Sequence, residues 1–194
     1  MRRLSLLPLI LFASCTQQQA PASTTTFTVV ETPMAEMRIA LEQGRVTSRE
    51  LVEQYLMRIA LYEDRINATL TVNPKALKEA DERDADRRQG NIRGPLHGIP
   101  IALKDNVHTT DMPTTGGAAA FEGLVPPYDA TLTKNLRDAG AIIIAKTNLT
   151  ELANWWREHR PPCLATTTPS AGTDSIRTTR DAIHVIKLAM AARH

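Results

Sequence analysis

Apolar residues recur at helical spacing in the first half of the chain. Between residues 51 and 62 they fall three or four positions apart, which predicts a helix with one buried face. Thr47 and Glu50 just before it have the spacing of a capping box, in which each side chain bonds a free backbone N–H of the first turn. The apolar positions of this face are Leu51, Val52, Tyr55, Leu56, Ile59 and Tyr62. We therefore predict a helix that begins at Thr47 and packs this face into the core.

Weaker patterns flank this helix. A short helix over residues 34–43 follows Pro33 and stops at Gly44. Residues 66–72 alternate apolar and polar positions, which is typical of a half-buried strand. The inward positions of the next helix are Ala76, Leu77 and Ala80.

The start and the charged half of that next helix carry their own signals. Asn73 is a good helix N-cap, and Pro74 suits a first helical position. Residues 79–88 are dense in both signs of charge, and Asp84 and Arg88 are one turn apart. We interpret this run as a solvated helix face with no binding role.

Two short apolar runs have the composition of buried strands. They span residues 99–103 and 141–145, and each is followed by a lysine. Residues 109–123 between them are typical of a loop, and Asp129 then offers a cap for a helix that ends at Gly140. The inward residues expected on this helix are Leu132, Leu136 and Ala139. The order strand, loop, helix, strand predicts a βαβ unit with parallel strands, and hence an α/β fold behind N-terminal helices.

The two lysines that follow these strands are the candidate site residues. Lys104 follows the first strand, and ligands of α/β sheets bind outside the carboxyl ends of the strands. Partial burial there would disfavour an ammonium ion, and an uncharged amine can accept a proton. Lys146 follows the second strand, and we interpret it as structural or as lining a cleft.

The stretch around Lys104 carries a specific resemblance. Residues 94–106, 109–117 and 146–153 resemble segments of the amidase signature family of serine-dependent amide hydrolases. The resemblance covers about residues 35–155. It implies hydrolysis of a small-molecule amide without metal or organic cofactor. It also implies that Lys104 is the base that removes a proton from a nucleophilic Ser through a second Ser held in a cis peptide.

The serine motifs of that family are incomplete here, so we expect a truncated domain with weak or no activity. Residues 172–177 echo the nucleophile motif with three residues missing, which would make Ser175 the nucleophile without the glycines that bind the oxyanion. We favour either a second alignment, which sets residues 171–172 and 177–182 against a helix start further downstream in the family, or a chance likeness after a change of reading frame. Residues 156–194 are then a divergent tail with a C-terminal helix, and the incomplete amidase domain spans residues 33–155.

The N-terminus predicts export. Arg2 and Arg3 precede an apolar run over residues 4–12 that is too short to span a bilayer, so residues 1–15 are interpreted as a signal peptide. Cys15 ends a segment that resembles a bacterial lipobox, which leaves lipidation at Cys15 and plain secretion both open. Residues 16–32 have the composition of a disordered tether. We expect a periplasmic protein, anchored to the membrane if Cys15 is modified.

Composition narrows the possible partners and cofactors of the protein. A net charge of +2 and 4% aromatic residues give no reason to expect nucleic acid as a partner. The two cysteines, Cys15 and Cys163, suggest no disulfide framework, and the five histidines show no metal-binding spacing. We expect neither a cofactor nor a metal. The alternative to an amidase is a non-catalytic envelope lipoprotein or binding module.

Overall fold

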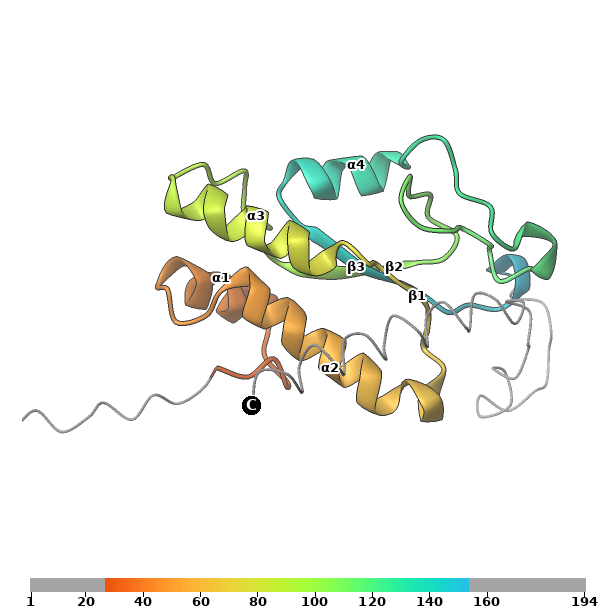
Figure 1. The fold of residues 1–194 in the computed structure, drawn as a ribbon, viewed down its shortest axis with the longest axis horizontal. Coiled ribbons are helices and arrows are strands. Elements are labelled where there is room, and N and C mark those ends of the chain that lie inside the picture. The colour runs from red at the N-terminus through yellow and green to blue at the C-terminus, as the bar shows by residue number, and fades with distance from the viewer. Residues whose placement is uncertain (1–26, 154–194) are drawn as a thin grey trace, which may run out of the picture.

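The computed structural model describes residues 27–153, which form an α/β fold of helices around a small mixed sheet. The helices are α1 (Met34–Glu42), α2 (Ser48–Ile66), α3 (Ala76–Arg88) and α4 (Thr131–Asp138). The strands are β1 (Thr69–Val72), β2 (Pro100–Lys104) and β3 (Ile142–Thr147). Two single 3-10 turns, Ala119–Phe121 and Glu151–Ala153, complete the described elements. Figure 1 shows their arrangement, and the predicted α/β class is confirmed.

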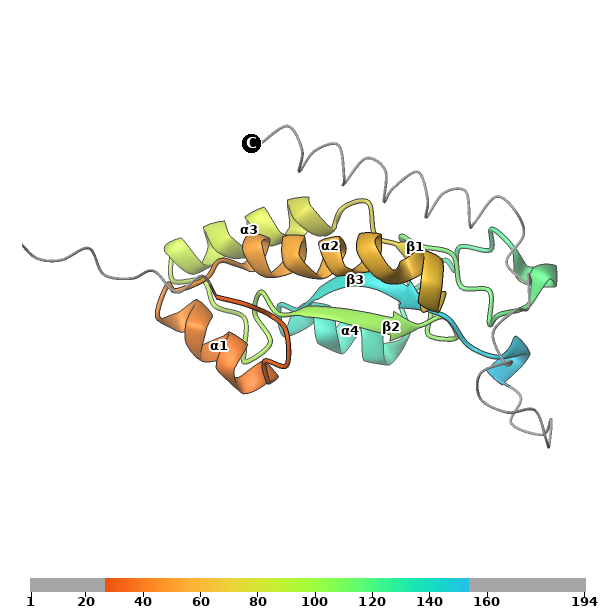
Figure 2. The ribbon, with the colours of Figure 1, turned by 90° about the horizontal axis from the view of Figure 1, so that it is seen from below.

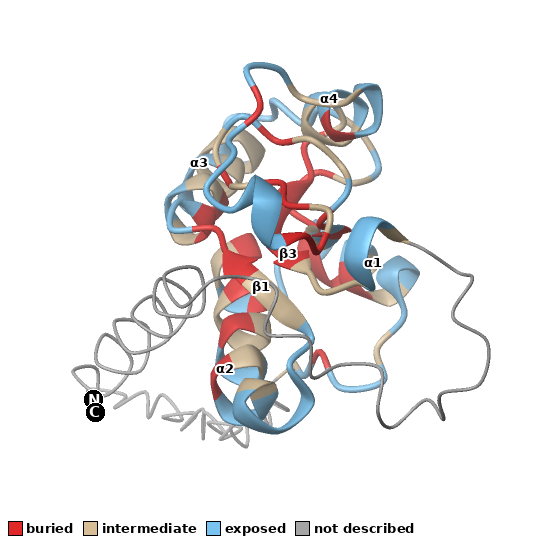
Figure 3. Cartoon of the chain, turned by 90° about the vertical axis from the view of Figure 1, so that its right-hand side faces the viewer, coloured by how far each residue is buried: buried red, intermediate tan, exposed pale blue. Residues whose placement is uncertain are grey.

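The sheet has the order β1-β3-β2, so β3 is central and β2 lies at an edge. Strands β2 and β3 are parallel, with α4 preceding β3 in the chain, which confirms the predicted βαβ unit. Strand β1 adds an antiparallel neighbour on the other edge of β3. The central strand is buried along almost its whole length (Figure 3).

Helices cover both faces of β3. On one face Ile142 and Ile144 pack in a cluster with α2, α3 and β1, and Figure 2 shows α2 and α3 together on that side. On the other face Ile143 packs with Leu103 and Met112, and Leu136 of α4 lies against them. Burial on both faces explains why the β3 run is continuously apolar instead of alternating.

Helix α2 begins as predicted. The Thr47 hydroxyl accepts from the Glu50 backbone N–H at 3.1 Å, and the Glu50 carboxylate accepts from the Thr47 N–H at 2.8 Å. The face at Leu51, Val52 and Leu56 is buried. The expected burial of Tyr62 is wrong, because Tyr62 lies in the last turns of α2 and is 44% exposed.

The start of α3 differs from the prediction. The helix begins at Ala76 with Lys75 as its N-cap residue, and Asn73 lies two positions earlier. The Asn73 side chain accepts from the Lys75 N–H at 2.8 Å and donates to the Ile143 carbonyl at 2.7 Å. Asn73 therefore ties the turn before α3 to β3 in addition to ordering the helix start.

The charged face of α3 has a structural role that its sequence did not indicate. The carboxylate of Asp84 accepts from the backbone N–H groups of Ser48 and Arg49, at 2.8 and 3.1 Å. N–H groups at the start of a helix have no partner within the helix, and a negative charge there interacts favourably with the helix dipole. Asp84 thus caps α2 across the helix pair, which replaces the expected pairing with Arg88.

Two expectations for α4 are wrong. Its N-cap residue is Ala130, and Asp129 makes contacts elsewhere. Leu132 is 53% exposed, because the buried position of the first turn is taken by Thr133, whose hydroxyl donates to the His108 carbonyl at 2.7 Å. Helix α4 is fastened by polar contacts to the preceding loop as well as by Leu136.

Residues 27–32, which the prediction assigned to the tether, contact the helices. Val29 is buried with Met37 and Leu41, and its N–H donates to the Gln54 side chain at 3.0 Å. The Gln54 amide in turn donates to the Phe27 carbonyl at 3.0 Å. Residues 27–32 therefore pack on α1 and α2, contrary to the expectation for this part of the tether.

Several predictions lie outside the described residues. They are the signal peptide over residues 1–15, the tether over residues 16–26 and the divergent tail. Among residues 27–153, none of the helices has the length and apolar character needed to traverse a bilayer.

Candidate functional site

The carboxyl ends of β2 and β3 lie side by side. Leu103 pairs with Lys146 and Lys104 pairs with Thr147, and the Asp105 N–H donates to the Thr147 carbonyl at 3.1 Å. Successive strand residues point to opposite faces, so Lys104 points away from the face that carries Leu103 and Lys146. The two candidate lysines lie at the same ends of neighbouring strands, but on opposite faces of the sheet.

Lys104 is the last residue of β2 and is exposed. The expected partial burial is not observed. Strand β2 lies at the edge of the described sheet, and Ala102 on the same face is exposed too. The amine is therefore accessible to a ligand that approaches this face, and its role as proton acceptor stays a prediction.

Lys146 is fully buried at the end of β3. Its Nζ donates to the Thr114 hydroxyl at 2.7 Å and to the Pro113 carbonyl at 3.2 Å, and lies 3.2 Å from Asp105 Oδ1. Burial lowers the pKa of Lys146 below its ordinary value, against the opposing effect of the Asp105 carboxylate. These contacts agree with the structural interpretation of this lysine.

Asp105 carries the matching negative charge and is 1% exposed. Its Oδ2 accepts from the Thr115 N–H at 2.9 Å and from the Thr115 hydroxyl at 2.5 Å, and its carbonyl accepts from the Gly116 N–H at 3.1 Å. Asp105 follows Lys104 directly, so it joins the end of β2 to the loop over residues 113–117.

Glycines let this loop approach the segment after β3. Gly116 and Gly117 have φ of +60° and +71°, a conformation that favours glycine. A Cβ on Gly117 would lie 3.0 Å from the Leu149 carbonyl oxygen, which is tighter than most real Cβ contacts. The Gly116 carbonyl accepts from the Leu152 N–H at 2.7 Å. Gly116 and Gly117 therefore mark a close approach of two backbone segments.

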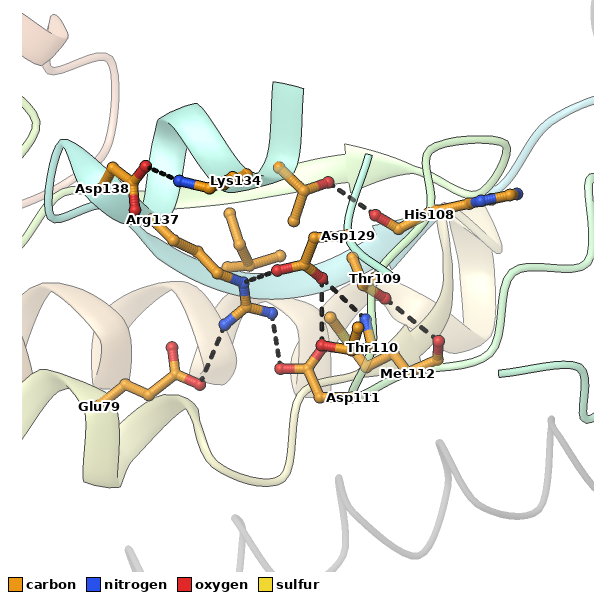
Figure 4. Close-up of polar contacts among 12 residues, drawn as sticks. Glu79, His108, Thr109, Thr110, Asp111, Met112, Asp129, Lys134, Arg137 and Asp138 are labelled. Carbon is orange, nitrogen blue, oxygen red and sulfur yellow. Dashed lines mark hydrogen bonds and ion pairs between the residues drawn. The ribbon is translucent and has the colours of Figure 1, made fainter. Parts of the chain in front are cut away.

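A second polar cluster holds the other end of the loop. Arg137 of α4 lies 2.7 Å from Asp111, 3.2 Å from Asp129 and 3.8 Å from Glu79 (Figure 4). The Asp129 carboxylate also accepts from the Thr110 N–H at 2.8 Å. Burial raises the pKa of Glu79, and its contacts with Asn73 and Arg137 oppose that effect. This cluster explains why Asp129 does not cap α4.

The sequence predicted both lysines at the strand ends but did not predict the residues that contact Lys146. Asp105, Thr114 and Thr115 carry no motif that marks them as partners of Lys146. The available signal was a lysine placed at the end of a fully apolar run, because a central strand is buried on both faces. Ser175 and Cys15 lie outside the described residues. Among residues 27–153, no three His, Cys, Asp or Glu side chains are grouped so as to hold a metal ion.

A strand pair with a lysine and a glycine-containing loop at its carboxyl ends is a typical location for the site of an α/β enzyme. Comparison with known families identifies which one. The model of the amidase family matches residues 50–175, which is more than half of the chain. The chain belongs to the amidase family, as the resemblance around Lys104 implied.

Individual relatives agree with this assignment. The chain is 44% identical over 120 residues to a glutamyl-tRNA(Gln) amidotransferase subunit of Rhodopirellula baltica, covering 61% of this chain and 24% of the relative. It is 47% identical over 120 residues to the corresponding amidotransferase subunit of Thermobifida fusca, with the same two shares. The chain thus spans about a quarter of the length of the curated relatives it matches.

Solved structures show the same fold. The peptide amidase of Stenotrophomonas maltophilia is 47% identical, with a TM-score of 0.62 over 64% of this chain and 26% of that one. An amidase family protein of Bacillus anthracis is 33% identical, with a TM-score of 0.60 over 63% of this chain and 25% of that one. The described residues correspond to part of these larger domains.

Proposed function

We propose that the carboxyl ends of β2 and β3 form part of an amide hydrolase site in which Lys104 accepts the proton of the nucleophile. The observation that carries this proposal is the position of Lys104. It is the last residue of β2, it lies beside Thr147 of the parallel β3, and its amine is exposed. A base at this place meets a ligand bound outside the strand ends.

The chemistry follows from the weakness of a serine hydroxyl as a nucleophile. A neighbouring uncharged amine can remove the hydroxyl proton as the oxygen attacks the amide carbon, and the proton is then available to the leaving amine. Backbone N–H groups of a glycine-rich loop must stabilise the negative oxygen of the intermediate. The part of this chain that echoes the nucleophile motif lacks those glycines around Ser175. We therefore propose weak or no hydrolysis by this chain alone.

The proposed substrate is a small molecule with a carbon–nitrogen amide bond. The relatives include a peptide amidase and an enzyme called fatty acid amide hydrolase, which is 27% identical with a TM-score of 0.55 over 65% of this chain. The amidotransferase relatives are named for glutamyl-tRNA instead. The amide bond is the chemistry that these names share, so it is the part of the substrate that we propose.

Release of ammonia or amine from a panel of peptide, fatty and aryl amides tests this proposal. We expect rates close to the uncatalysed background. Clear turnover that is lost in Lys104→Ala would refute the proposed inactivity while supporting Lys104 as the base. Clear turnover that is equal in wild type and Lys104→Ala would refute the role of Lys104.

A fluorophosphonate probe separates the two alignments of the tail, because it labels only an activated serine. We expect no labelling. Labelling at Ser175 that disappears in Lys104→Ala would show that Ser175 is a nucleophile served by this lysine. Ser175→Ala is the matched control for the site of labelling.

The second candidate is a non-catalytic, exported binding module, anchored to the membrane through lipid at Cys15. The basic and apolar pattern of residues 1–15 favours this candidate. It predicts a cooperative melting transition by circular dichroism in wild type and in Lys104→Ala alike. It also predicts detergent-phase partitioning that is lost in Cys15→Ala. Protein that stays in the cytoplasm of the producing bacterium would contradict the export proposal.

A further inference from the structure

Lys146 and Asp105 form a buried pair of opposite charges, which we call the positioning pair. Their side chains are 0% and 1% exposed, and Nζ lies 3.2 Å from Oδ1. Among residues 27–153 they are the only Lys, Arg, Asp or Glu residues in the buried class. A buried ion pair is weak evidence for stability, because well-packed apolar residues often replace such pairs without loss. The question is therefore what else the pair provides.

The two members of the positioning pair hold consecutive parts of one loop. Lys146 binds the Pro113 carbonyl at 3.2 Å and the Thr114 hydroxyl at 2.7 Å. Asp105 binds the N–H and the hydroxyl of Thr115, at 2.9 and 2.5 Å. Its backbone carbonyl accepts from the Gly116 N–H at 3.1 Å. Four successive loop residues are thus bonded to two side chains and one backbone carbonyl.

Both members also lie next to Lys104 in the sheet. Asp105 is its neighbour in the chain, and the Asp105 N–H donates to the Thr147 carbonyl at 3.1 Å. Lys146 is the register partner of Leu103, which precedes Lys104. The loop contacts therefore act on the part of the backbone from which the Lys104 side chain extends.

We propose that Lys146 and Asp105 are positioning residues that hold residues 113–117 against the end of β2 and thereby fix the backbone at Lys104. The catalytic meaning of this inference rests on the proposed function, but the positioning itself does not. Within residues 27–153, β2 has ladder bonds on one side only, so its last residue needs further contacts to keep one geometry. The positioning pair provides those contacts from the loop.

Amide hydrogen exchange measures this role directly, residue by residue. In Lys146→Met we expect the amides of Asp105, Thr115 and Gly116 to exchange about tenfold or more faster, relative to the core amides of Leu51 and Ile142. Those two core amides donate to Thr47 and Ile99 carbonyls, away from the loop. Equal acceleration at the loop and core amides would mean that the pair supports only global stability, and would overturn the proposal.

A double variant separates positioning from stability further. Lys146→Met leaves Asp105 without its counter-charge, and adding Asp105→Asn removes that uncompensated charge. We expect the double variant to recover thermal stability relative to Lys146→Met, while Thr115 and Gly116 still exchange about tenfold faster than in wild type. Recovery of both stability and slow exchange would refute a positioning role.

A milder variant, Thr114→Val, tests the positioning role if Lys146→Met does not fold. Thr114→Val removes only the hydroxyl that Nζ contacts at 2.7 Å, and should speed exchange at Thr115 and Gly116 by about threefold to tenfold without changing Leu51. Wild-type exchange in Thr114→Val would count against the proposal. Lys134→Met removes an exposed lysine paired with Asp138 and is the control that should change nothing.

None of these measurements requires turnover. An inactive chain therefore leaves the test intact, and Lys104→Ala should not change exchange at Thr115 or Gly116. If Lys104→Ala abolishes hydrolysis but the loop amides behave as in wild type in Lys146→Met, the proposed role of Lys104 as the base stands and the positioning inference fails.

Discussion

The ends of β2 and β3 carry the same residue type in opposite environments. Each strand is a short apolar run followed closely by a lysine, yet Lys104 is exposed and Lys146 is fully buried. The difference lies in the faces of the sheet, because Lys146 shares the face of Leu103 that residues 113–114 cover, and Lys104 lies on the opposite face. Position in the sheet, and not the local sequence, decides which lysine is accessible to a ligand and which holds the structure together.

The largest expected effect on stability is at the buried lysine, Lys146. Lys146→Met should lower the free energy of unfolding by about 3–5 kcal/mol, because it leaves the Asp105 carboxylate buried without its counter-charge. Urea unfolding followed by circular dichroism measures this loss. A loss below about 1 kcal/mol would contradict the expected cost of leaving a buried carboxylate without its counter-charge.

Removal of one loop contact should have a smaller effect. Thr115→Val keeps the side-chain shape but deletes the hydroxyl that donates to Asp105 Oδ2 at 2.5 Å and accepts from the Gly117 N–H at 3.1 Å. Hydrogen bonds to charged groups contribute about 1.5–3 kcal/mol, so we expect a loss in that range. Thr110→Val is the control, because its hydroxyl lies at an exposed position. Equal losses in the two variants would contradict the special role of Thr115.

His97, a second buried basic group, extends the comparison to the effect of pH on stability. Its Nε2 bonds the Arg83 carbonyl at 2.9 Å and its Nδ1 accepts from the Arg93 N–H at 3.2 Å, so the ring is neutral. Burial lowers the pKa of His97, with Arg87 and Arg83 acting in the same direction and the Arg83 carbonyl and Asp86 against it. The unfolded chain therefore binds a proton first as the pH falls.

Because the unfolded chain binds the proton first, the folded state loses stability as the pH falls. Below the unfolded pKa of about 6.5, stability should fall by up to about 1.4 kcal/mol per pH unit until the lowered folded pKa is reached. Unfolding curves between pH 5 and 8 measure the slope, and His97→Gln should remove it. An identical slope in His97→Gln would assign the effect to other groups.

The smallest expected effect on stability is at the exposed lysine, Lys104. Lys104→Ala should change the free energy of unfolding by no more than about 0.5 kcal/mol, since exposed side chains away from packed features contribute little. Thermal melting beside Lys146→Met tests the contrast within one experiment. A loss at Lys104 as large as the loss at Lys146 would show that both lysines support the fold.

Local patterns predicted the elements well. The capping box of Thr47 and Glu50, the apolar face of α2 and the continuous β3 run all act through neighbours in the chain or through burial on both faces. These signals depend on a few adjacent residues, so the sequence alone contains them. The resemblance around Lys104 predicted the family, and the family comparison confirmed it.

Predictions about polar side chains failed where distant segments meet. Asp129 was expected to cap α4 but lies against Arg137 and the Thr110 N–H. Asp84 was expected on a solvated face but caps α2 from another helix. A short carboxylate can satisfy several kinds of donor, and tertiary packing decides which donor is near. The burial of Lys146 was hidden for the same reason, because the order of strands is not written in any one segment.

The close approach at Gly117 limits which sequences can encode this loop. A methyl group there would press on the carbonyl oxygens of Leu149 and Thr150, at 3.0 and 3.3 Å, in a backbone conformation that already disfavours side chains. In a saturation mutagenesis library scored for folded protein, glycine should be strongly enriched at position 117, while the neighbouring exposed Ala119 and Ala120 accept many replacements.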